Sequence, residues 1–249
     1  MFKEVLKIGL GLSLVASSLL AAPEKTKLKI GFIALTDCAP LVVAKEKGFF
    51  EAEGLDVHVA KEGGGWPGIQ QKVISGEYDF SHALAGMPIA STLGINGDTN
   101  LQALMSLDLN GNAITYGNKI IEEMEKFGLK KDVRPVSAES LKKYIDYKHE
   151  QEGSNYQPLN FGMVHPVSTH NYELRYWMAA SGIKPDEDTT IKPFPPPTMP
   201  QNLIAGNIDG YCVGEPWNSR IVLKGAGSAL VTNYDIWNNN PEKSFTSKG

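Results

Sequence analysis

The sequence predicts an α/β fold made of two similar lobes, and two observations carry this prediction. Short apolar strands alternate with amphipathic helices along the chain, which is the pattern of parallel strand–helix–strand units. There is also a weak internal repeat, because ISGEYD at 74–79 is echoed by IAGNID at 204–209, each between an amphipathic helix and a short strand. Two lobes of similar build would produce this echo, and a strand crossing between them could pass at 108–112.

The first part of the chain has the pattern of a strand, a helix and a second strand. An alternating strand at 29–35 leads to a helix that Pro40 can open, and another alternating strand follows at 55–60. Three glycines at 63–65 precede Trp66 and lack the spacing of a phosphate-binding loop. We interpret them as a turn that brings the backbone or Trp66 close to another group, although packing between lobes is the commoner role of such a tryptophan.

The stretch 159–185 predicts a buried strand, a short polar turn and a helix that ends before Pro185. His170 lies where this helix begins, and Ser168 and Thr169 can cap its first turn. Free backbone N–H groups and the positive end of the helix dipole beside an imidazole could form an anion site. A histidine at a helix start is more often a cap or a surface residue, so this stretch alone leaves both roles open.

Further elements are expected between and after these stretches. They are strands at 101–107, 113–116, 210–213 and 229–232, and helices at 120–127, 138–147, 199–205 and 216–224. No element is assigned to the polar ending at 238–249. The domain prediction gives 27–110 and 214–249 to the first lobe and 111–213 to the second lobe.

The composition is that of an ordinary globular chain. Its 249 residues suffice for one large or two small domains, and its formal net charge of −4 argues against nucleic acid as a partner. Only two cysteines are present, Cys38 and Cys212, each in an apolar context. One disulfide is compatible with them, but we expect two buried free thiols, because a core of this size needs no crosslink.

The first residues have the pattern of a secretory signal peptide. Lys3 and Lys7 precede an apolar run at 8–22, whose 15 residues are short for a membrane span. A lipoprotein anchor would need a cysteine directly after this run, and Cys38 lies well beyond it. The sequence therefore predicts a signal peptide at 1–22 and a soluble, periplasmic mature protein.

Several polar residues receive a structural interpretation. Asp37, in TDCAP, is interpreted as part of a cap for the first helix, and Glu215, in GEPW, as favouring the positive end of a helix dipole. His82 and His165 lie in apolar surroundings and are interpreted as interior or lobe-edge groups. No pair of histidines, cysteines or carboxylates has the spacing of a metal site, so neither a metal nor another cofactor is predicted.

Four stretches carry a resemblance to a known family: GFIALTDCAPLVVAKEKGFFEAEGLDV, AGMPIASTLGI, THNYELRYWMAASGI and CVGEPWNSR. Together they resemble the nitrate and bicarbonate solute-binding proteins of ABC importers, within the nitrate/sulfonate/taurine group of periplasmic binding proteins. The resemblance covers about 27–243 and implies a periplasmic-binding-protein fold of type II, with two α/β lobes gripping an oxyanion in the cleft. The family continues with another long helical segment that packs on the first lobe, so the resemblance also implies a C-terminally truncated form.

The resemblance implies four ligand-binding residues. Trp66 matches the family's cleft tryptophan, and His170 matches the cleft histidine at the start of the second-lobe helix. Lys243, in NPEK, matches the lysine of the family's HPEK element. Asn112 follows an Asn-Gly pair where the nitrate binders have a glutamine, so it keeps the amide and shortens its reach by one methylene.

The hydrogen-bonding groups of these residues indicate which class of ligand they can bind. Nitrate accepts hydrogen bonds and donates none, so its site should offer indole, ammonium, imidazole and amide N–H groups. Bicarbonate carries an O–H and needs a carboxylate or a metal beside it. Lys243 supplies a cationic donor and not the acceptor that bicarbonate needs. A lysine near a C-terminus is, however, usually solvated.

We therefore expect a monomeric, non-enzymatic binding protein that delivers nitrate or nitrite to an ABC permease. Bicarbonate and organosulfonates are the alternative ligands. An enzyme resembling the pyrimidine-precursor synthases is disfavoured, because the chain lacks their cysteine-rich motif. A cytoplasmic nitrate sensor is disfavoured by the export signal.

Overall fold

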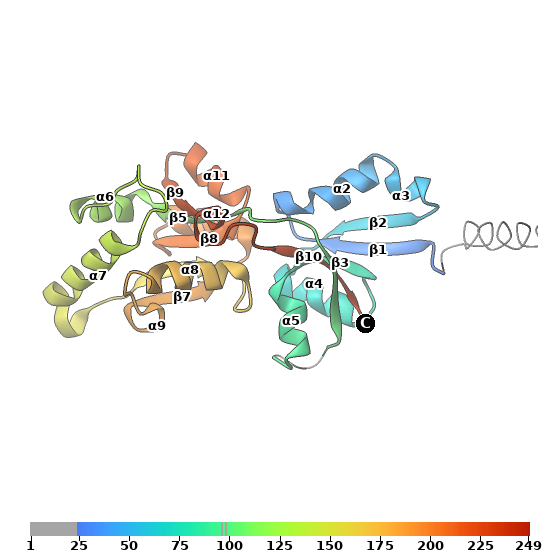
Figure 1. Ribbon diagram of the computed structural model, residues 1–249, viewed down its shortest axis with the longest axis horizontal. Coiled ribbons are helices and arrows are strands. Elements are labelled where there is room, and N and C mark those ends of the chain that lie inside the picture. Colours follow the sequence, from blue (N-terminus) through green and yellow to red (C-terminus); the bar gives the residue numbers. More distant parts are fainter. Residues whose placement is uncertain (1–23, 96, 98) are drawn as a thin grey trace, which may run out of the picture.

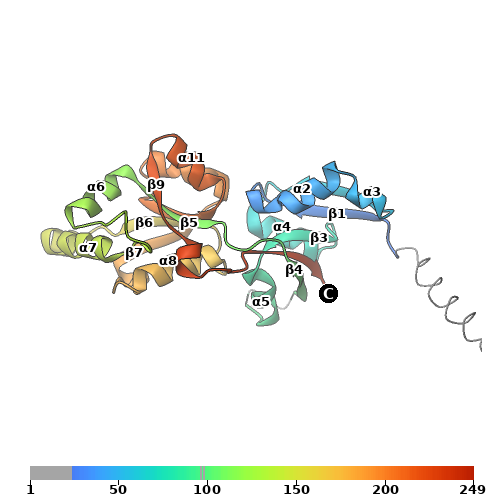
Figure 2. The same ribbon diagram turned by 45° about the horizontal axis from the view of Figure 1, so that its top comes forward.

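The computed structural model describes residues 24–95, 97 and 99–249, which form two α/β lobes joined by two crossing segments (Figure 1, Figure 2). Each lobe contains a five-stranded sheet flanked by helices. The two-lobed α/β prediction is therefore confirmed. The predicted signal peptide at 1–22 lies outside the described residues. Within them, no helix is both long enough and apolar enough to cross a membrane.

The first lobe is formed by both ends of the described chain. Its elements are β1 (Lys27–Phe32), the 3₁₀ helix η1 (Thr36–Cys38), α2 (Ala39–Glu46), α3 (Phe49–Ala52), β2 (Asp56–Lys61), α4 (Gly65–Ile74), β3 (Phe80–Leu84), α5 (Gly86–Thr92), β4 (Leu101–Ser106) and β10 (Lys243–Lys248). The strand order in its sheet is β2-β1-β3-β10-β4. β1 is parallel to β2 and β3, whereas β10 is antiparallel to β3 and β4.

The second lobe contains the middle of the chain. Its elements are β5 (Asn112–Gly117), α6 (Asn118–Lys126), α7 (Glu139–Glu152), η2 (Gly153–Asn155), β6 (Leu159–Met163), α8 (Thr169–Ala179), α9 (Pro185–Asp188), β7 (Thr189–Pro193), η3 (Pro196–Thr198), α10 (Met199–Ile204), β8 (Gly210–Gly214), α11 (Trp217–Leu223), β9 (Gly227–Thr232) and α12 (Asn233–Ile236). The strand order is β7-β6-β8-β5-β9, with β5 antiparallel to both neighbours. The inner strands that run antiparallel to both neighbours are β10 in the first sheet and β5 in the second. Each of them directly follows a crossing from the other lobe.

The internal repeat corresponds to equivalent positions in the two lobes. Asp79 N donates to Lys29 O, and Lys29 N donates to Asp79 Oδ2 at 2.8 Å. In the second lobe, Asp209 N donates to Asn160 O, and Asn160 N donates to Asp209 Oδ2 at 2.7 Å. Each aspartate thus ties the start of one parallel strand to its neighbour, which explains why both copies end in Asp.

The chain returns to the first lobe later than predicted. The sequence predicts 214–249 in the first lobe, but β9 and α12 belong to the second, because β9 pairs with β5 and completes the second sheet. The second crossing therefore runs through 237–242, and the first through 107–111.

The polar ending contains the strand β10, which the sequence analysis did not predict. β10 lies between β3 and β4, the two other strands at that side of the first sheet. Its Ser244 and Thr246 are buried, and their hydroxyl groups lie 2.9 Å apart and hydrogen-bond each other. Because these polar side chains satisfy one another, the strand needs no apolar pattern of the kind used to find the others.

The two lobes share one apolar cluster. Leu35 and Trp66 of the first lobe belong to it together with Val167 and Trp217 of the second lobe. Apolar residues of the two lobes are therefore packed against each other, and the lobes are closed. Cys38 and Cys212 are buried free thiols, as predicted.

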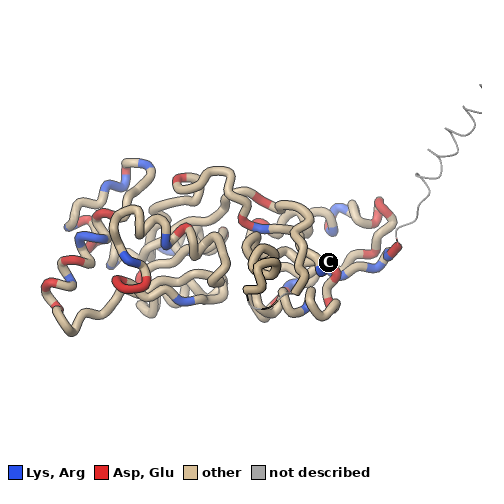
Figure 3. The backbone as a smooth tube through the Cα atoms, turned by 60° about the horizontal axis from the view of Figure 1, so that its bottom comes forward, with Lys and Arg blue, Asp and Glu red and all other residues tan. Residues whose placement is uncertain are grey.

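Acidic and basic residues are interspersed along both lobes of the described chain (Figure 3). The formal net charge of the chain is −4, and neither lobe carries residues of only one sign of charge.

Candidate functional site

The two crossing segments run antiparallel to each other between the lobes. Asn110 N donates to Asn240 O at 2.9 Å, and Leu109 forms an isolated bridge with Pro241. Farther along, Leu107 N donates to Lys243 O at 2.9 Å. This pairing brings side chains from both crossings to the junction of the lobes.

Further contacts between the two lobes accompany these crossings. Thr36 N of the first lobe donates to Glu215 O of the second at 2.9 Å, and Trp217 Nε1 donates to Ala34 O at 3.2 Å. Gly86, at the start of α5, approaches Val167 so closely that an added Cβ would overlap the Val167 carbonyl oxygen. A glycine is therefore required at position 86 for this closed arrangement.

Lys243 lies at the centre of the junction. Its side chain is fully buried, and its ammonium pairs with the Glu242 carboxylate and with Asp37 Oδ2 at 2.9 Å. The ammonium also lies 5.3 Å from the centroid of the Trp66 ring. A buried charge needs such partners, because desolvation would otherwise make it very unfavourable. The structure therefore brings the predicted Lys243 and Trp66 together.

Trp66 lies at the start of α4 and is 1% exposed. Its ring packs against His82 with centroids 5.5 Å apart. Its indole N–H has no hydrogen-bond partner among the described residues. A buried donor of this kind calls for an explanation, because nearly all buried polar groups are hydrogen-bonded.

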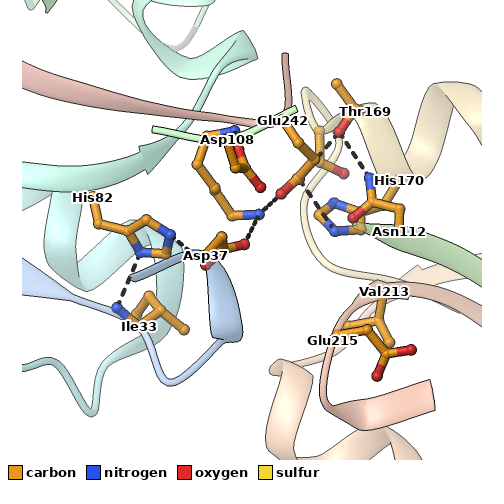
Figure 4. Close-up of polar contacts among 12 residues, drawn as sticks. Ile33, Asp37, His82, Asp108, Asn112, Thr169, His170, Val213, Glu215 and Glu242 are labelled. Carbon is orange, nitrogen blue, oxygen red and sulfur yellow. Dashed lines mark hydrogen bonds and ion pairs between the residues drawn. The ribbon is translucent and has the colours of Figure 1, made fainter. Parts of the chain in front are cut away.

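His170 is placed by the predicted cap of α8. Ser168 Oγ accepts from Asn171 N at 3.2 Å, which orders the first turn and confirms the predicted capping residue. The His170 ring is fully buried, and neither nitrogen has hydrogen-bond geometry, although Nε2 lies 3.3 Å from Glu242 Oε1 (Figure 4). Burial, assisted by the charge of Lys243, lowers the pKa of His170 well below its usual value. The ring is therefore a neutral imidazole with one N–H to donate.

Asn112, at the start of β5, presents its amide in a different way from that predicted. Its Nδ2 donates to Thr169 Oγ1 at 3.3 Å (Figure 4) and to Glu173 Oε2 at 3.1 Å. Its Oδ1 is buried and has no partner among the described residues. That oxygen lies beside Gly214, at the junction that also holds Asp37. Both N–H groups of the amide are thus used by the protein, and the group it presents is an acceptor.

Asp37 is part of this cluster, and its interpretation as a helix cap is wrong. Neither η1 nor α2 has a side-chain cap hydrogen bond. Instead, Asp37 Oδ1 lies 2.7 Å from His82 Nε2, and its Oδ2 faces Lys243 (Figure 4). Burial raises the pKa of Asp37, but Lys243 and His82 outweigh burial and hold the pKa well below its usual range. Asp37 follows a predicted strand, and α/β proteins bind ligands at the ends of their strands. This position was the clue in the sequence that Asp37 belongs to the site.

Two further carboxylates join Asp37, and the sequence analysis missed both. Asp108 and Glu242 come from the two crossings, and ligand atoms of all three residues lie within 4.8 Å of one another. Asp108 Oδ1 accepts from Lys243 N at 2.7 Å, and burial raises the pKa of Asp108 to about 6. Oxygens grouped in this way could hold a metal ion, although the ammonium of Lys243 already pairs with two of the carboxylates.

A cavity of about 380 Å³ adjoins the cluster at Trp66. Its walls come from both lobes, at 64–67, 164–166 and 193–195. It provides mainly apolar space beside the indole ring, between the same two lobes that carry Trp66 and His170.

The two lobes, the paired crossings and the buried polar cluster between them define a periplasmic-binding-protein fold of type II with its ligand cleft closed. The chain belongs to the NMT1-like family, whose model matches residues 21–249.

Relatives with described transport roles are similar over most of this chain. The nitrate import ATP-binding protein NrtC of Synechocystis sp. (strain PCC 6803) is 46% identical over 225 residues, covering 88% of this chain and 31% of that protein. The bicarbonate transport ATP-binding protein CmpC of the same organism is 41% identical over 223 residues, covering 88% and 31%. The nitrate/nitrite binding protein NrtA of Nostoc sp. (strain PCC 7120) is 37% identical over 231 residues, covering 90% and 49%. The chain thus spans less than half the length of these curated relatives.

The crystal structure of the periplasmic nitrate-binding protein NrtA from Synechocystis PCC 6803 matches with a TM-score of 0.79 and 33% sequence identity. The match covers 92% of this chain and 57% of that chain. The alkanesulfonate-binding protein SsuA from Xanthomonas axonopodis pv. citri matches with a TM-score of 0.62 at 17% identity, a likeness of fold alone.

Proposed function

We propose that this chain is the periplasmic solute-binding component of an ABC importer and that it closes on nitrate or nitrite. One observation carries the ligand assignment. Buried donors without hydrogen-bond partners come from both lobes: Trp66 lies beside the ammonium of Lys243, and His170 lies beside Glu242, which pairs with that ammonium. A small anion between the lobes would accept from these donors and would favour the closed population. The nitrate-binding relatives support this ligand, and in this role the monomer passes the anion to a permease without catalysing a reaction.

The donor set suits an anion that only accepts hydrogen bonds. The indole and the neutral imidazole each offer one N–H, and the ammonium adds charge. Charge-assisted hydrogen bonds contribute about 1.5–3 kcal/mol each. Three of them contribute about 4.5–9 kcal/mol, from which the cost of association must be subtracted.

Bicarbonate is the second candidate, and Asn112 Oδ1 is the observation that favours it. This buried oxygen has no partner and can accept a hydrogen bond from the ligand, which nitrate cannot supply. The carboxylates of Asp37, Asp108 and Glu242 add further acceptors or a place for a cation. The similarity to a bicarbonate transport protein is in keeping with this alternative.

Calorimetry of the purified protein with nitrate, bicarbonate and taurine tests the ligand. We expect nitrate to produce a saturable heat at micromolar concentrations and to raise the melting temperature. A ligand at one hundred times its Kd stabilises the folded state by about 2.7 kcal/mol, which a melting curve resolves. Heat from bicarbonate alone or from taurine alone would refute the nitrate assignment. Cell fractionation tests the location, and a cytoplasmic protein would instead favour a sensor.

The Trp66→Phe variant is expected to weaken nitrate binding by about tenfold or more, because it removes one N–H directed at the anion. The phenyl ring keeps most of the packing against His82 and Lys243. Calorimetry gives the affinity, and urea denaturation gives the free energy of unfolding.

Trp177→Phe is the matched control, because Trp177 is also a buried tryptophan of an amphipathic helix. Its Nε1 donates to Val136 O at 2.7 Å, in the interior of the second lobe. We expect this control to lose stability and to keep its nitrate affinity. If the two variants bind nitrate equally well, the indole of Trp66 does not contact the anion.

A further inference from the structure

We propose that Glu173 is the positioning residue that decides which end of the Asn112 amide faces the ligand. It would thereby determine whether the site favours an anion that only accepts hydrogen bonds or one that carries an O–H group. This role rests on the proposed anion-binding function and adds to it a residue that sets anion selectivity without contacting the anion.

Glu173 lies on α8 and is 1% exposed. Its Oε2 accepts from Asn112 Nδ2 at 3.1 Å, and the Cys212 thiol lies 3.8 Å from the same oxygen. Its Oε1 accepts from Asn240 Nδ2 at 3.0 Å. These partners come from β5, β8 and the second crossing, so Glu173 links three separate elements behind the cleft.

An ionised carboxylate has no hydrogen to donate, so every partner of Glu173 must be a donor. Asn112 therefore turns its NH₂ group towards Glu173, and its Oδ1 faces the other way. The oxygen then lies near Gly214, since a Cβ on that glycine would be 3.5 Å from Asn112 Oδ1 and 3.7 Å from Asp37 Oδ2. The acceptor is thus displayed at the junction of the lobes.

A second contact holds the amide in the same orientation. The Thr169 hydroxyl donates to Glu242 Oε1 at 3.1 Å, which uses its only hydrogen. Its oxygen is then left to accept from Asn112 Nδ2 at 3.3 Å (Figure 4). Of the two carboxylates that fix the amide, Glu173 acts directly and Glu242 acts through Thr169.

Protonation of Glu173 would release the direct constraint, because a carboxylic acid can donate to Asn112 Oδ1; the Thr169 hydroxyl would then turn its hydrogen from Glu242 to the amide as well. Burial raises the pKa of Glu173 to about 7, against the opposing effect of hydrogen bonds from Asn112, Asn240 and Cys212 and the charge of Lys243. The Cys212 thiol stays neutral, since burial raises its pKa well above the usual value. Below pH 7 the amide can therefore turn and offer N–H to the anion, whereas above pH 7 it offers oxygen.

The Glu173→Gln variant tests this role, because glutamine has the same shape and keeps a donor at every pH. At pH 8 we expect the ratio of nitrate to bicarbonate affinity to shift towards nitrate by about tenfold, the size of one hydrogen bond to a charged group. Between pH 8 and pH 6, nitrate affinity should rise more steeply in the wild type than in the variant, in which Asp108, with a pKa of about 6, still titrates. Calorimetry measures all three quantities, with Glu187→Gln, an exposed position on α9, as the control.

The possible outcomes separate this role from the proposed function. A wild-type protein that binds neither anion refutes both. Intact wild-type binding with an unchanged ratio in Glu173→Gln, or an equal loss of both anions, refutes the positioning role alone. Should the variant fail to fold, the wild-type pH profile decides, and a nitrate affinity that does not change between pH 8 and pH 6 overturns the proposal.

Discussion

Replacing Lys243 by methionine is expected to weaken nitrate binding by at least tenfold. Methionine keeps the length of the stem and removes the ammonium. The carboxylates of Asp37 and Glu242 then lose their buried cationic partner and repel the incoming anion. Breaking a buried ion pair on one side costs about 3–5 kcal/mol of stability, so the variant should also unfold at lower urea concentration. Calorimetry and urea titration measure the two effects.

Lys248→Met is the matched control, because Lys248 lies at the exposed end of the same strand. Its Nζ donates to Ile74 O at 3.0 Å, and it contacts no residue of the cleft cluster in the described structure. We expect unchanged nitrate affinity and a change in stability within about 0.5 kcal/mol. If the Lys243→Met variant binds nitrate as tightly as the wild type, the ammonium does not hold the anion.

Gly86→Ala is expected to keep the two lobes from closing. The added methyl group would overlap the carbonyl oxygen of Val167, which belongs to the backbone of the other lobe and cannot move aside independently. Each lobe should still fold, because the overlap exists only in the closed arrangement. If the closed population falls to about 1%, the apparent nitrate affinity falls about a hundredfold.

Small-angle scattering with and without nitrate, combined with calorimetry, tests this second expectation. The wild type should become more compact with nitrate, and Gly86→Ala should not. Gly63→Ala is the control, since nothing lies within 4 Å of a Cβ at that glycine. A Gly86→Ala variant that compacts and binds nitrate like the wild type would mean that ligand binding does not need this closed contact.

The fold was predictable where an element depends on interactions between residues close together in the sequence. The α8 helix begins at a capping serine, and Asp79 and Asp209 end two copies of one short motif. The strand β10 was missed because its hydroxyl groups satisfy each other in the sheet, so it shows no alternation of apolar residues. The late return to the first lobe was missed because the pairing of β9 with β5 depends on residues distant in sequence.

For the site, residue type and family resemblance indicate the donors Trp66, His170 and Lys243. The acceptors beside them depend on tertiary contacts. Asp37, Asp108 and Glu242 come from a strand end and from two crossings that meet only when the lobes close. The direction of the Asn112 amide depends on Glu173 and Thr169 of another element. Spacing along the chain carries no information about such contacts, because each one is made by folding.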